Sequence, residues 1–196
     1  MKRPEVVIID DNLMQGDPLI IKLEIAKYHV VLFRHSQDGL NYILNNMQKE
    51  LIVILDINFA NGELNGHEVI KKIREQNKLI PVIIWSAKTG EEVDFTDFVN
   101  NHALYYVKQT GNTQEIIKSI EDAYHHLQLD IATAMENWLE IQDNQEQILS
   151  IGVDGRPYSA KDLIKEIRMQ TEEGRRIEKS IINLTIDLLF RNKESV

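Results

Sequence analysis

Several polar side chains stand at the ends of short apolar runs, where they could take part in chemistry together. Asp10 and Asp11 follow the run in "VVIIDDN", and Asp56 ends "LIVILD". Ser86 follows "VIIW", and Lys108 follows "YYV". Each residue alone has an ordinary explanation, such as a helix cap, a turn hydroxyl or a solvated charge. Because these groups recur at the ends of successive runs, their joint pattern indicates one site.

The acids in this set predict a metal ion. Three carboxylates that lie close together repel one another and become partly protonated unless a cation lies among them. Oxygen ligands suit Mg²⁺, which prefers octahedral coordination and keeps several waters. We expect Asp11 and Asp56 to bind the ion directly and Asp10 to act through a water molecule. A backbone carbonyl near Asn58 is a further candidate ligand.

The same arrangement predicts phosphoryl chemistry. With Mg²⁺ bound, Asp56 becomes a workable nucleophile toward a phosphoryl group, because the ion screens the approach of two anions. The Ser86 hydroxyl and the Lys108 ammonium are suitable donors to the phosphoryl oxygens. A haloacid-type phosphotransferase would need a second acid two residues after Asp56, whereas position 58 holds asparagine.

Strands and helices that alternate along the first part of the chain would position these groups. Apolar runs predict strands over residues 6–10, 28–33, 51–56, 80–85 and 103–107. Apolar residues at helical spacing predict helices over residues 17–27, 37–47, 66–76 and 91–100. The runs lack period-2 alternation, which fits strands covered on both faces of a parallel sheet. The predicted fold class is α/β, a doubly wound five-stranded parallel sheet followed by an α-helical extension. Carboxyl ends of parallel strands share one edge, so the polar groups are expected to converge there.

At these residues the chain resembles the receiver domains of bacterial two-component response regulators, over about residues 4–124. The resemblance rests on the acidic pair, the aspartate of "LIVILDIN", the "SA" of "IIWSAK" and the lysine of "LYYVKQ". Ser86 lies 30 residues after Asp56, and Lys108 lies 22 residues after Ser86. These separations are similar to those of the chemotaxis receivers, and the implied fold is flavodoxin-like.

The resemblance implies a role for each residue of the set and for a few neighbours. The implied roles are phospho-acceptor for Asp56, metal-site acids for Asp10 and Asp11, switch hydroxyl for Ser86, phosphoryl-binding lysine for Lys108, switch aromatic for Tyr105, and positions that tune phosphoryl loss for Asn58 and Lys88. It also implies a histidine kinase or a phosphotransfer protein as partner. The protein is then a signalling phospho-acceptor rather than an enzyme, apart from self-phosphorylation and self-dephosphorylation.

Some positions depart from the receiver pattern. Gln109 follows the lysine where receivers often have proline, and Phe59 and Ala60 replace the usual methionine-proline pair. Gly66 also arrives later than is common, so the loop after Asp56 is longer. None of these changes removes a chemical group from the predicted site.

Bulk composition excludes several classes of function. The formal net charge of -9 disfavours non-specific binding to nucleic acid or to anionic membranes, because both need a cationic surface. Without cysteine, disulfides and thiolate chemistry are excluded, and a reducing compartment is compatible. No apolar stretch has the length of a signal-peptide core or a membrane span. We therefore expect a cytoplasmic protein with no membrane partner.

The chain changes character after the predicted receiver, residues 1–124. Apolar residues recur every three or four positions over residues 113–149, which contain neither proline nor glycine. This pattern predicts one long helix, with an extended linker at residues 125–150, that pairs in a coiled-coil manner. Two glycines and a proline in residues 150–159 predict a turn and a boundary, with Asp154 and Gly155 closing a small hairpin.

Residues 151–196 are predicted to be a helical output or dimerisation region. Ser159 is the predicted N-cap of the last helical stretch, with Asp162 three residues later. The apolar seam of this stretch passes through Gly174 without losing phase. One helix with a weak point and two helices that meet at residues 171–174 both fit the pattern.

The sequence leaves several hypotheses open for how the region after the receiver acts. Apolar seams favour helix-mediated association, with a homodimer as the expected form, which phosphorylation would switch. A small DNA-binding output is the alternative, with Gly174 in a helix-turn-helix bend, although acidic residues balance the basic ones there. A degenerate receiver that associates independently of phosphate is a further alternative. For an enzymatic output, the sequence contains no nucleophile-base pair, metal-ligand spacing or Gly-rich phosphate loop.

Overall fold

The computed structural model describes residues 3–60, 62–87, 95–109, 113–128, 130–142, 144, 146–152 and 155–191. The chain divides into two compact units, Met1–Gln128 and Leu129–Val196, and each is described by itself. Among the helices of these described residues, none combines the length and the apolar character needed to cross a lipid bilayer.

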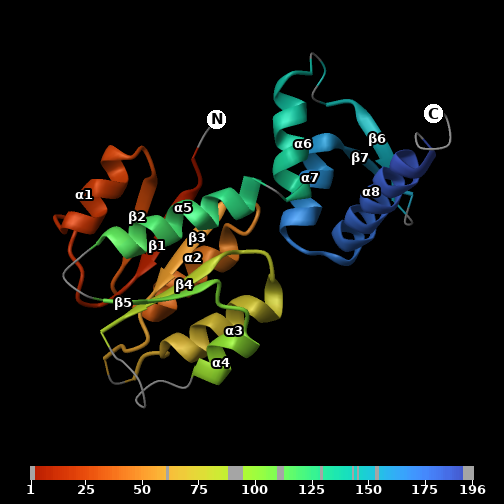
Figure 1. Ribbon diagram of the computed structural model, residues 1–196. Helices are drawn as coiled ribbons and strands as arrows, with labels where there is room; N and C mark the ends of the chain where they lie inside the picture. The colour runs from red at the N-terminus through yellow and green to blue at the C-terminus, as the bar shows by residue number, and fades with distance from the viewer. Residues whose placement is uncertain are drawn as a thin grey trace. The chain divides into compact units, whose positions relative to one another are not determined.

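A five-stranded parallel sheet forms the centre of the first unit (Figure 1). Its strands are β1 (Glu5–Ile9), β2 (His29–Phe33), β3 (Leu51–Leu55), β4 (Val82–Ser86) and β5 (Tyr105–Lys108). They lie in the order β2-β1-β3-β4-β5, and all pairs are parallel. This is the flavodoxin-like order, so the predicted fold class is confirmed. Strands β3 and β4 are buried along their whole length, as their unbroken apolar runs require.

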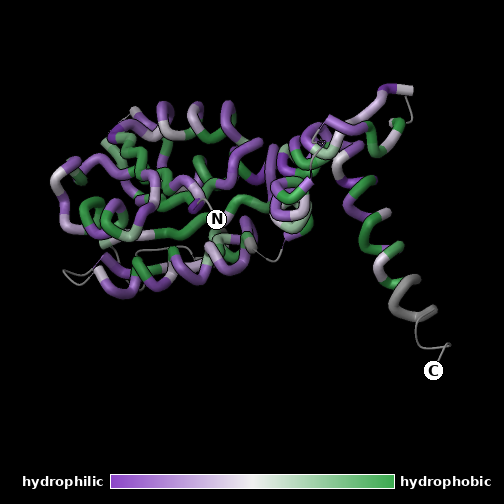
Figure 2. The backbone as a smooth tube through the Cα atoms, turned by 90° about the horizontal axis from the view of Figure 1, so that it is seen from above, coloured by the Kyte–Doolittle hydropathy of each residue, from purple (hydrophilic) through white to green (hydrophobic). Residues whose placement is uncertain are grey.

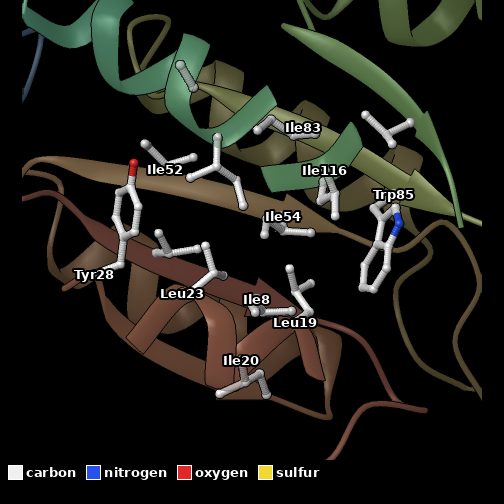
Figure 3. Close-up of a cluster of buried hydrophobic side chains, with 14 of the residues drawn as sticks. Ile8, Leu19, Ile20, Leu23, Tyr28, Ile52, Ile54, Ile83, Trp85 and Ile116 are labelled. Carbon is white, nitrogen blue, oxygen red and sulfur yellow. The ribbon is translucent and has the colours of Figure 1, made fainter. Parts of the chain in front are cut away.

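Helices cover both faces of the sheet. They are α1 (Pro18–Ile25), α2 (Ser36–Asn45), α3 (Gly66–Gln76), α4 (Phe95–Asn100) and α5 (Gln114–Gln128). Side chains of α1 and α5 share a core with one face, as Figure 3 shows for Leu19, Leu23 and Ile116 around Ile8 and Ile54. Side chains of α2, α3 and α4 form a second core on the opposite face. The receiver boundary expected at residue 124 lies inside α5, whose Leu127 still packs in the first core.

The single long helix predicted over residues 113–149, with its extended linker at 125–150, is wrong. Helix α5 ends at Gln128, and a separate helix, α6 (Ile131–Glu140), follows. The Asp130 carboxylate accepts a hydrogen bond from the Thr133 N–H at 2.6 Å, so it caps the start of a new helix. The apolar spacing continues across the break because both helices are amphipathic. The predicted coiled-coil pairing required one continuous helix, and α5 and α6 do not form one.

The second unit combines helices with a small hairpin. Strands β6 (Ile148–Ile151) and β7 (Pro157–Ser159) pair antiparallel, with Gly155 at φ 80° in the connection. The hairpin is as predicted, although Asp154 lies outside the described residues. Helix α7 (Ala160–Arg168) follows and begins with the predicted capping box of Ser159 and Asp162.

The last stretch of the chain forms two helices, which decides between the two predicted alternatives. Helix α8 (Glu172–Arg191) follows α7 after a short turn in which Gln170 has φ 52°. The Thr171 hydroxyl accepts a hydrogen bond from the Gly174 N–H at 3.0 Å, so Thr171 caps α8. A Cβ built on Gly174 would lie 2.0 Å from the Glu166 carbonyl oxygen, so the glycine lets α8 start directly against α7.

Helix α8 is only partly covered. Ile177 is buried in the core of this unit, with residues of α6 and α7. Further along, Leu184 is 59% exposed, and Ile182 and Ile186 are each nearly half exposed. Figure 2 shows hydrophobic residues recurring along the α8 tube. An apolar helix surface of this kind is characteristic of an interaction site.

Candidate functional site

The carboxyl ends of β1, β3, β4 and β5 form one edge of the first unit, because these strands are parallel (Figure 1). Asp56 continues the ladder past β3, since its N–H donates to the Ile9 carbonyl at 2.9 Å. Ser86 and Lys108 are register partners at the ends of β4 and β5. The predicted site residues therefore share the edge that the sequence assigns to them.

An acidic cluster occupies this edge. Carboxylate oxygens of Asp10, Asp11 and Asp56 all lie within 4.8 Å of one another. Asp10 and Asp56 are only 1% and 5% exposed, whereas Asp11 is half-buried. Two buried carboxylates at this distance lose hydration and repel each other, and either a bound cation or protonation of one of them would relieve the repulsion.

Asp10 has one satisfied oxygen and one unsatisfied oxygen. Its Oδ1 accepts hydrogen bonds from the N–H groups of Asn12 and Leu13, at 2.8 and 3.1 Å. Its Oδ2 is buried and has no hydrogen-bond partner among the described residues. Burial raises the pKa of Asp10 above its ordinary value, and the nearby charges of Asp11 and Asp17 raise it further. A buried carboxylate oxygen without a donor is well suited to a metal ion or to its bound water.

Asp56 is held by donors around its carboxylate. Oδ1 accepts the N–H of Ile57 at 2.7 Å, and the Ser86 hydroxyl and the Asn58 N–H also donate to the carboxylate. Burial raises the pKa of Asp56, these hydrogen bonds oppose the rise, and the Asp10 charge adds to it. The carboxylate is therefore fixed in direction and energetically disfavoured without a cation.

This donor set fits Mg²⁺. All three side chains offer a carboxylate oxygen to one cluster, and one Asp10 oxygen, Oδ2, is buried and unsatisfied. Asp10, Asp11 and Asp56 would hold the ion, with waters completing the octahedron. The Asn58 N–H faces the Asp56 carboxylate, and the role of the Asn58 carbonyl as a ligand stays a prediction.

The long loop after Asp56 returns to its starting point at Gly66. The Gly66 N–H donates to the Ile57 carbonyl at 2.8 Å, and Asn65 begins α3 with a capping box completed by Glu68. A Cβ on Gly66 would lie 2.5 Å from the Asp56 carbonyl oxygen and 2.8 Å from Ile57 Cα. Glycine is therefore required at this position, because a methyl group would displace the backbone of Asp56 and Ile57.

The remaining predicted residues differ in their burial and in their contacts. Ser86 is fully buried, whereas Lys108 is exposed, and among the described residues no ion pair joins Lys108 to Asp56. Tyr105 is half-buried and packs toward the core that α1 and α5 cover. The Gln109 N–H donates to the Ser86 carbonyl at 2.8 Å, so the residue in place of proline extends the β4–β5 pairing. Lys88 lies outside the described residues.

Sequence reasoning missed other residues near the site. Burial raises the pKa of Tyr106, and the negative charge of Asp56 raises it further, so this phenol lies within electrostatic reach of Asp56. Strand alternation directs Tyr106 to the face opposite that of Tyr105, a signal that was available in the sequence. Arg34 contacts the loop that contains Asp11, and Glu63, in the loop after Asp56, contacts His35 and Ser36. No motif marks either residue.

Comparison with known proteins identifies relatives of the first unit. A family model described as the response regulator receiver domain matches residues 6–121. Response regulator SaeR of Staphylococcus aureus is 27% identical over 127 residues, which cover 62% of this chain and 53% of the relative. A probable transcriptional regulatory protein of Picosynechococcus is 30% identical over 95 residues, which cover 45% of this chain and 37% of that protein. The chain thus spans about half, or less, of the length of these curated relatives.

Solved structures support the fold. A response regulator receiver domain protein from Clostridium thermocellum matches with a TM-score of 0.57 at 21% identity, covering 64% of this chain and 98% of its own. A CheY-like receiver domain protein from Methanospirillum hungatei matches with a TM-score of 0.56 at 18% identity, covering 65% of this chain and 99% of its own. Both alignments cover almost the whole of a receiver.

Proposed function

This chain belongs to the response regulator receiver family, and from that premise we propose that it accepts a phosphoryl group on Asp56, with Mg²⁺, from a histidine kinase or a phosphotransfer protein. The observation that carries the proposal is the cluster of three carboxylates with one buried, unsatisfied oxygen at the edge of the sheet. Receivers are signalling modules of two-component systems, and we propose no enzymatic activity beyond self-phosphorylation and self-dephosphorylation. The cytoplasmic location stays a prediction.

The transfer step assigns a role to each residue. An Asp56 carboxylate oxygen forms a bond to phosphorus while the bond from phosphorus to the donor's leaving group breaks, and that group departs with its electron pair. When bound, Mg²⁺ neutralises charge on the transferring oxygens. The Lys108 ammonium donates to the same oxygens from the end of β5.

Ser86 connects the transfer to a change of state. Its hydroxyl donates to the Asp56 carboxylate before transfer, and it would donate to a phosphoryl oxygen afterwards. This change of partner moves the end of β4, and we propose that Tyr105, on the neighbouring strand β5, responds as the switch aromatic. Phosphorylation would then bias an equilibrium between two receiver states.

Uptake of a phosphoryl group is the direct test. Incubating the full chain with acetyl phosphate and Mg²⁺ should add about 80 Da to its intact mass. Removing Mg²⁺ with a chelator should prevent the gain, because the buried acids otherwise repel the incoming anion. An equal gain in the presence of the chelator would contradict the metal-assisted mechanism.

We propose helix-mediated self-association as the output. The apolar side chains exposed on α8 support it, since burying them against a second copy removes apolar surface from water. A DNA-binding output is the second candidate, because one relative is described as a transcriptional regulatory protein. The first turn of α8 carries Glu172 and Glu173, which would repel phosphates at the end of a recognition helix. Arg176 is also paired with Glu173, so association is the better supported reading.

Light scattering with and without beryllofluoride, a phosphoryl mimic, separates these outputs. We expect the mimic to raise the fraction of dimer, and Leu184→Glu to abolish that rise because it places a charge on the exposed apolar surface of α8. Leu184→Met, which keeps an apolar side chain at the same position, is the matched control and should retain the rise. A monomer under both conditions that binds duplex DNA through Arg175 or Arg176 would favour the second candidate.

A further inference from the structure

The stretch from the end of β2 to the first residue of α2, residues 34–36, contacts both loops that carry the acids of the site. One of these loops follows β1 and contains Asp10 and Asp11, and the other follows β3 and begins at Asp56. Strands β2 and β3 lie on either side of β1 in the sheet. A contact between residues 34–36 and the loop after Asp56 therefore links the two strands that flank β1, the strand that leads to Asp10 and Asp11.

Arg34 holds the first of these loops. Its Nε and Nη2 donate to the main-chain carbonyl oxygen of Asp11, at 3.1 and 2.7 Å. Both donors of one planar guanidinium converge on a single oxygen, so the contact fixes direction as well as distance. The Asp11 carboxylate itself accepts from the Asn12 side-chain amide at 2.7 Å. Asp11 is thus held at its backbone by Arg34 and at its side chain by Asn12.

Glu63 fastens the second loop to the same connection. Its Oε1 lies 2.8 Å from Nδ1 of His35, and its Oε2 accepts the Ser36 N–H at 2.7 Å. Ser36 is the first residue of α2, so a carboxylate from a distant loop takes the place of a local N-cap. The hydrogen bond from His35 lowers the pKa of Glu63, and the same bond raises the pKa of His35. This hydrogen bond therefore favours the charged form of each partner.

We propose that Arg34 and Glu63 are positioning residues for the metal site: with His35 and Ser36 they form a brace that holds the two acid-bearing loops at the separation that Mg²⁺ requires. This inference rests on the proposed function. The longer loop after Asp56 has a purpose in this arrangement, because it is what brings Glu63 to the start of α2. Hydrogen-bond partners that orient metal ligands affect affinity even though they do not touch the ion.

Arg34 allows the positioning role to be separated from simple electrostatics. A cation next to the acids repels Mg²⁺, so charge alone predicts that Arg34→Gln binds Mg²⁺ more tightly and that Arg34→Lys leaves binding unchanged. The brace predicts weaker binding in both variants, because neither side chain can direct two donors onto the Asp11 carbonyl.

The test measures Mg²⁺ binding by the full chain from the rise of the unfolding temperature with Mg²⁺ concentration. Trp85, buried beside Ser86 at the end of β4, reports unfolding of the receiver when the exposed Trp138 is replaced by Phe. We expect Arg34→Gln, Arg34→Lys and Glu63→Gln each to weaken Mg²⁺ binding roughly tenfold. Lys72→Gln and Glu75→Gln change charge at exposed positions of α3 and should leave binding within about twofold of the parent.

The outcomes are distinguishable. If the parent chain responds to Mg²⁺ and Arg34→Lys responds equally, the brace is overturned while the metal site stands. If Arg34→Gln binds more tightly than the parent, Arg34 acts only through its charge and the brace is again overturned. A parent chain that does not respond to Mg²⁺ overturns the metal site and this inference with it.

Discussion

Replacing Asp56 with asparagine will abolish phosphoryl uptake and, at neutral pH without Mg²⁺, raise the unfolding temperature. The loss of uptake follows from the chemistry, since the asparagine amide is a poor nucleophile and the acyl phosphate needs a carboxylate oxygen. The shape of the side chain is almost unchanged, so the loops around it have no reason to move.

The gain in stability follows from the charge. Burial and the neighbouring Asp10 raise the pKa of Asp56 above its ordinary value of 3.8. For an acid whose pKa is raised by folding, the unfolded chain loses its proton first, so folding is penalised as pH rises through and above 3.8. Asparagine has no such penalty. The pH dependence of the unfolding temperature should therefore be weaker in the variant than in the parent.

Intact-mass measurements with acetyl phosphate and Mg²⁺, together with thermal unfolding in a chelator from acidic to neutral pH, test both parts. Asp122→Asn, a half-buried aspartate of α5, is the matched control and should keep uptake. If Asp56→Asn still gains the phosphoryl mass, another acid is the acceptor. If it is less stable than the parent without Mg²⁺, the cluster is not electrostatically strained.

Replacing Gly174 with alanine will unfold or separate α7 and α8, although helix propensity alone predicts the opposite. In an exposed helix, alanine would stabilise by about 1 kcal/mol relative to glycine. Here the added Cβ would lie 2.0 Å from the Glu166 carbonyl oxygen and 2.8 Å from the Ile167 nitrogen. These are backbone atoms of α7, so the helix must shift as a whole.

That shift breaks contacts which define the turn between the two helices. The Glu166 carbonyl accepts the Thr171 N–H at 3.2 Å, and Thr171 in turn caps α8 through the Gly174 N–H. We expect the free energy of unfolding of this unit to fall by about 3 kcal/mol, because the steric cost of the added methyl group against the α7 backbone exceeds the gain in helix propensity. Ile177, which α8 contributes to the core, would lose its packing.

Hydrogen exchange resolved by peptide measures this effect locally. Peptides that cover α7 and α8 should lose protection in Gly174→Ala, whereas peptides from β1 and β3 should keep theirs. Gly16→Ala is the matched control, because a Cβ at Gly16 meets nothing within 4 Å. Unchanged protection in α7 and α8 would mean that the helices tolerate a wider separation than their backbone contacts indicate.

The sequence by itself determined the sheet and the polar side chains that stand at its edge. Runs such as "LIVIL" are short, rich in β-branched residues and apolar at every position, which favours a strand covered on both faces, and parallel pairing then brings the ends of β1 and β3 together. Asp10, Asp11 and Asp56 could be selected as candidate site residues because they stand at those ends. Local signals were also sufficient at Ser159, where the capping box depends on residues three apart.

Only the tertiary structure decided where the helices end and which side chains brace the site. Amphipathic spacing is the same in one helix and in two successive ones, so it could not reveal the break that Asp130 caps between α5 and α6. The bond from Arg34 to Asp11 joins residues 23 apart, and the bond from His35 to Glu63 joins residues 28 apart. Contacts between residues so far apart produce no periodic pattern in the sequence. They form only because of the order in which the strands lie in the sheet.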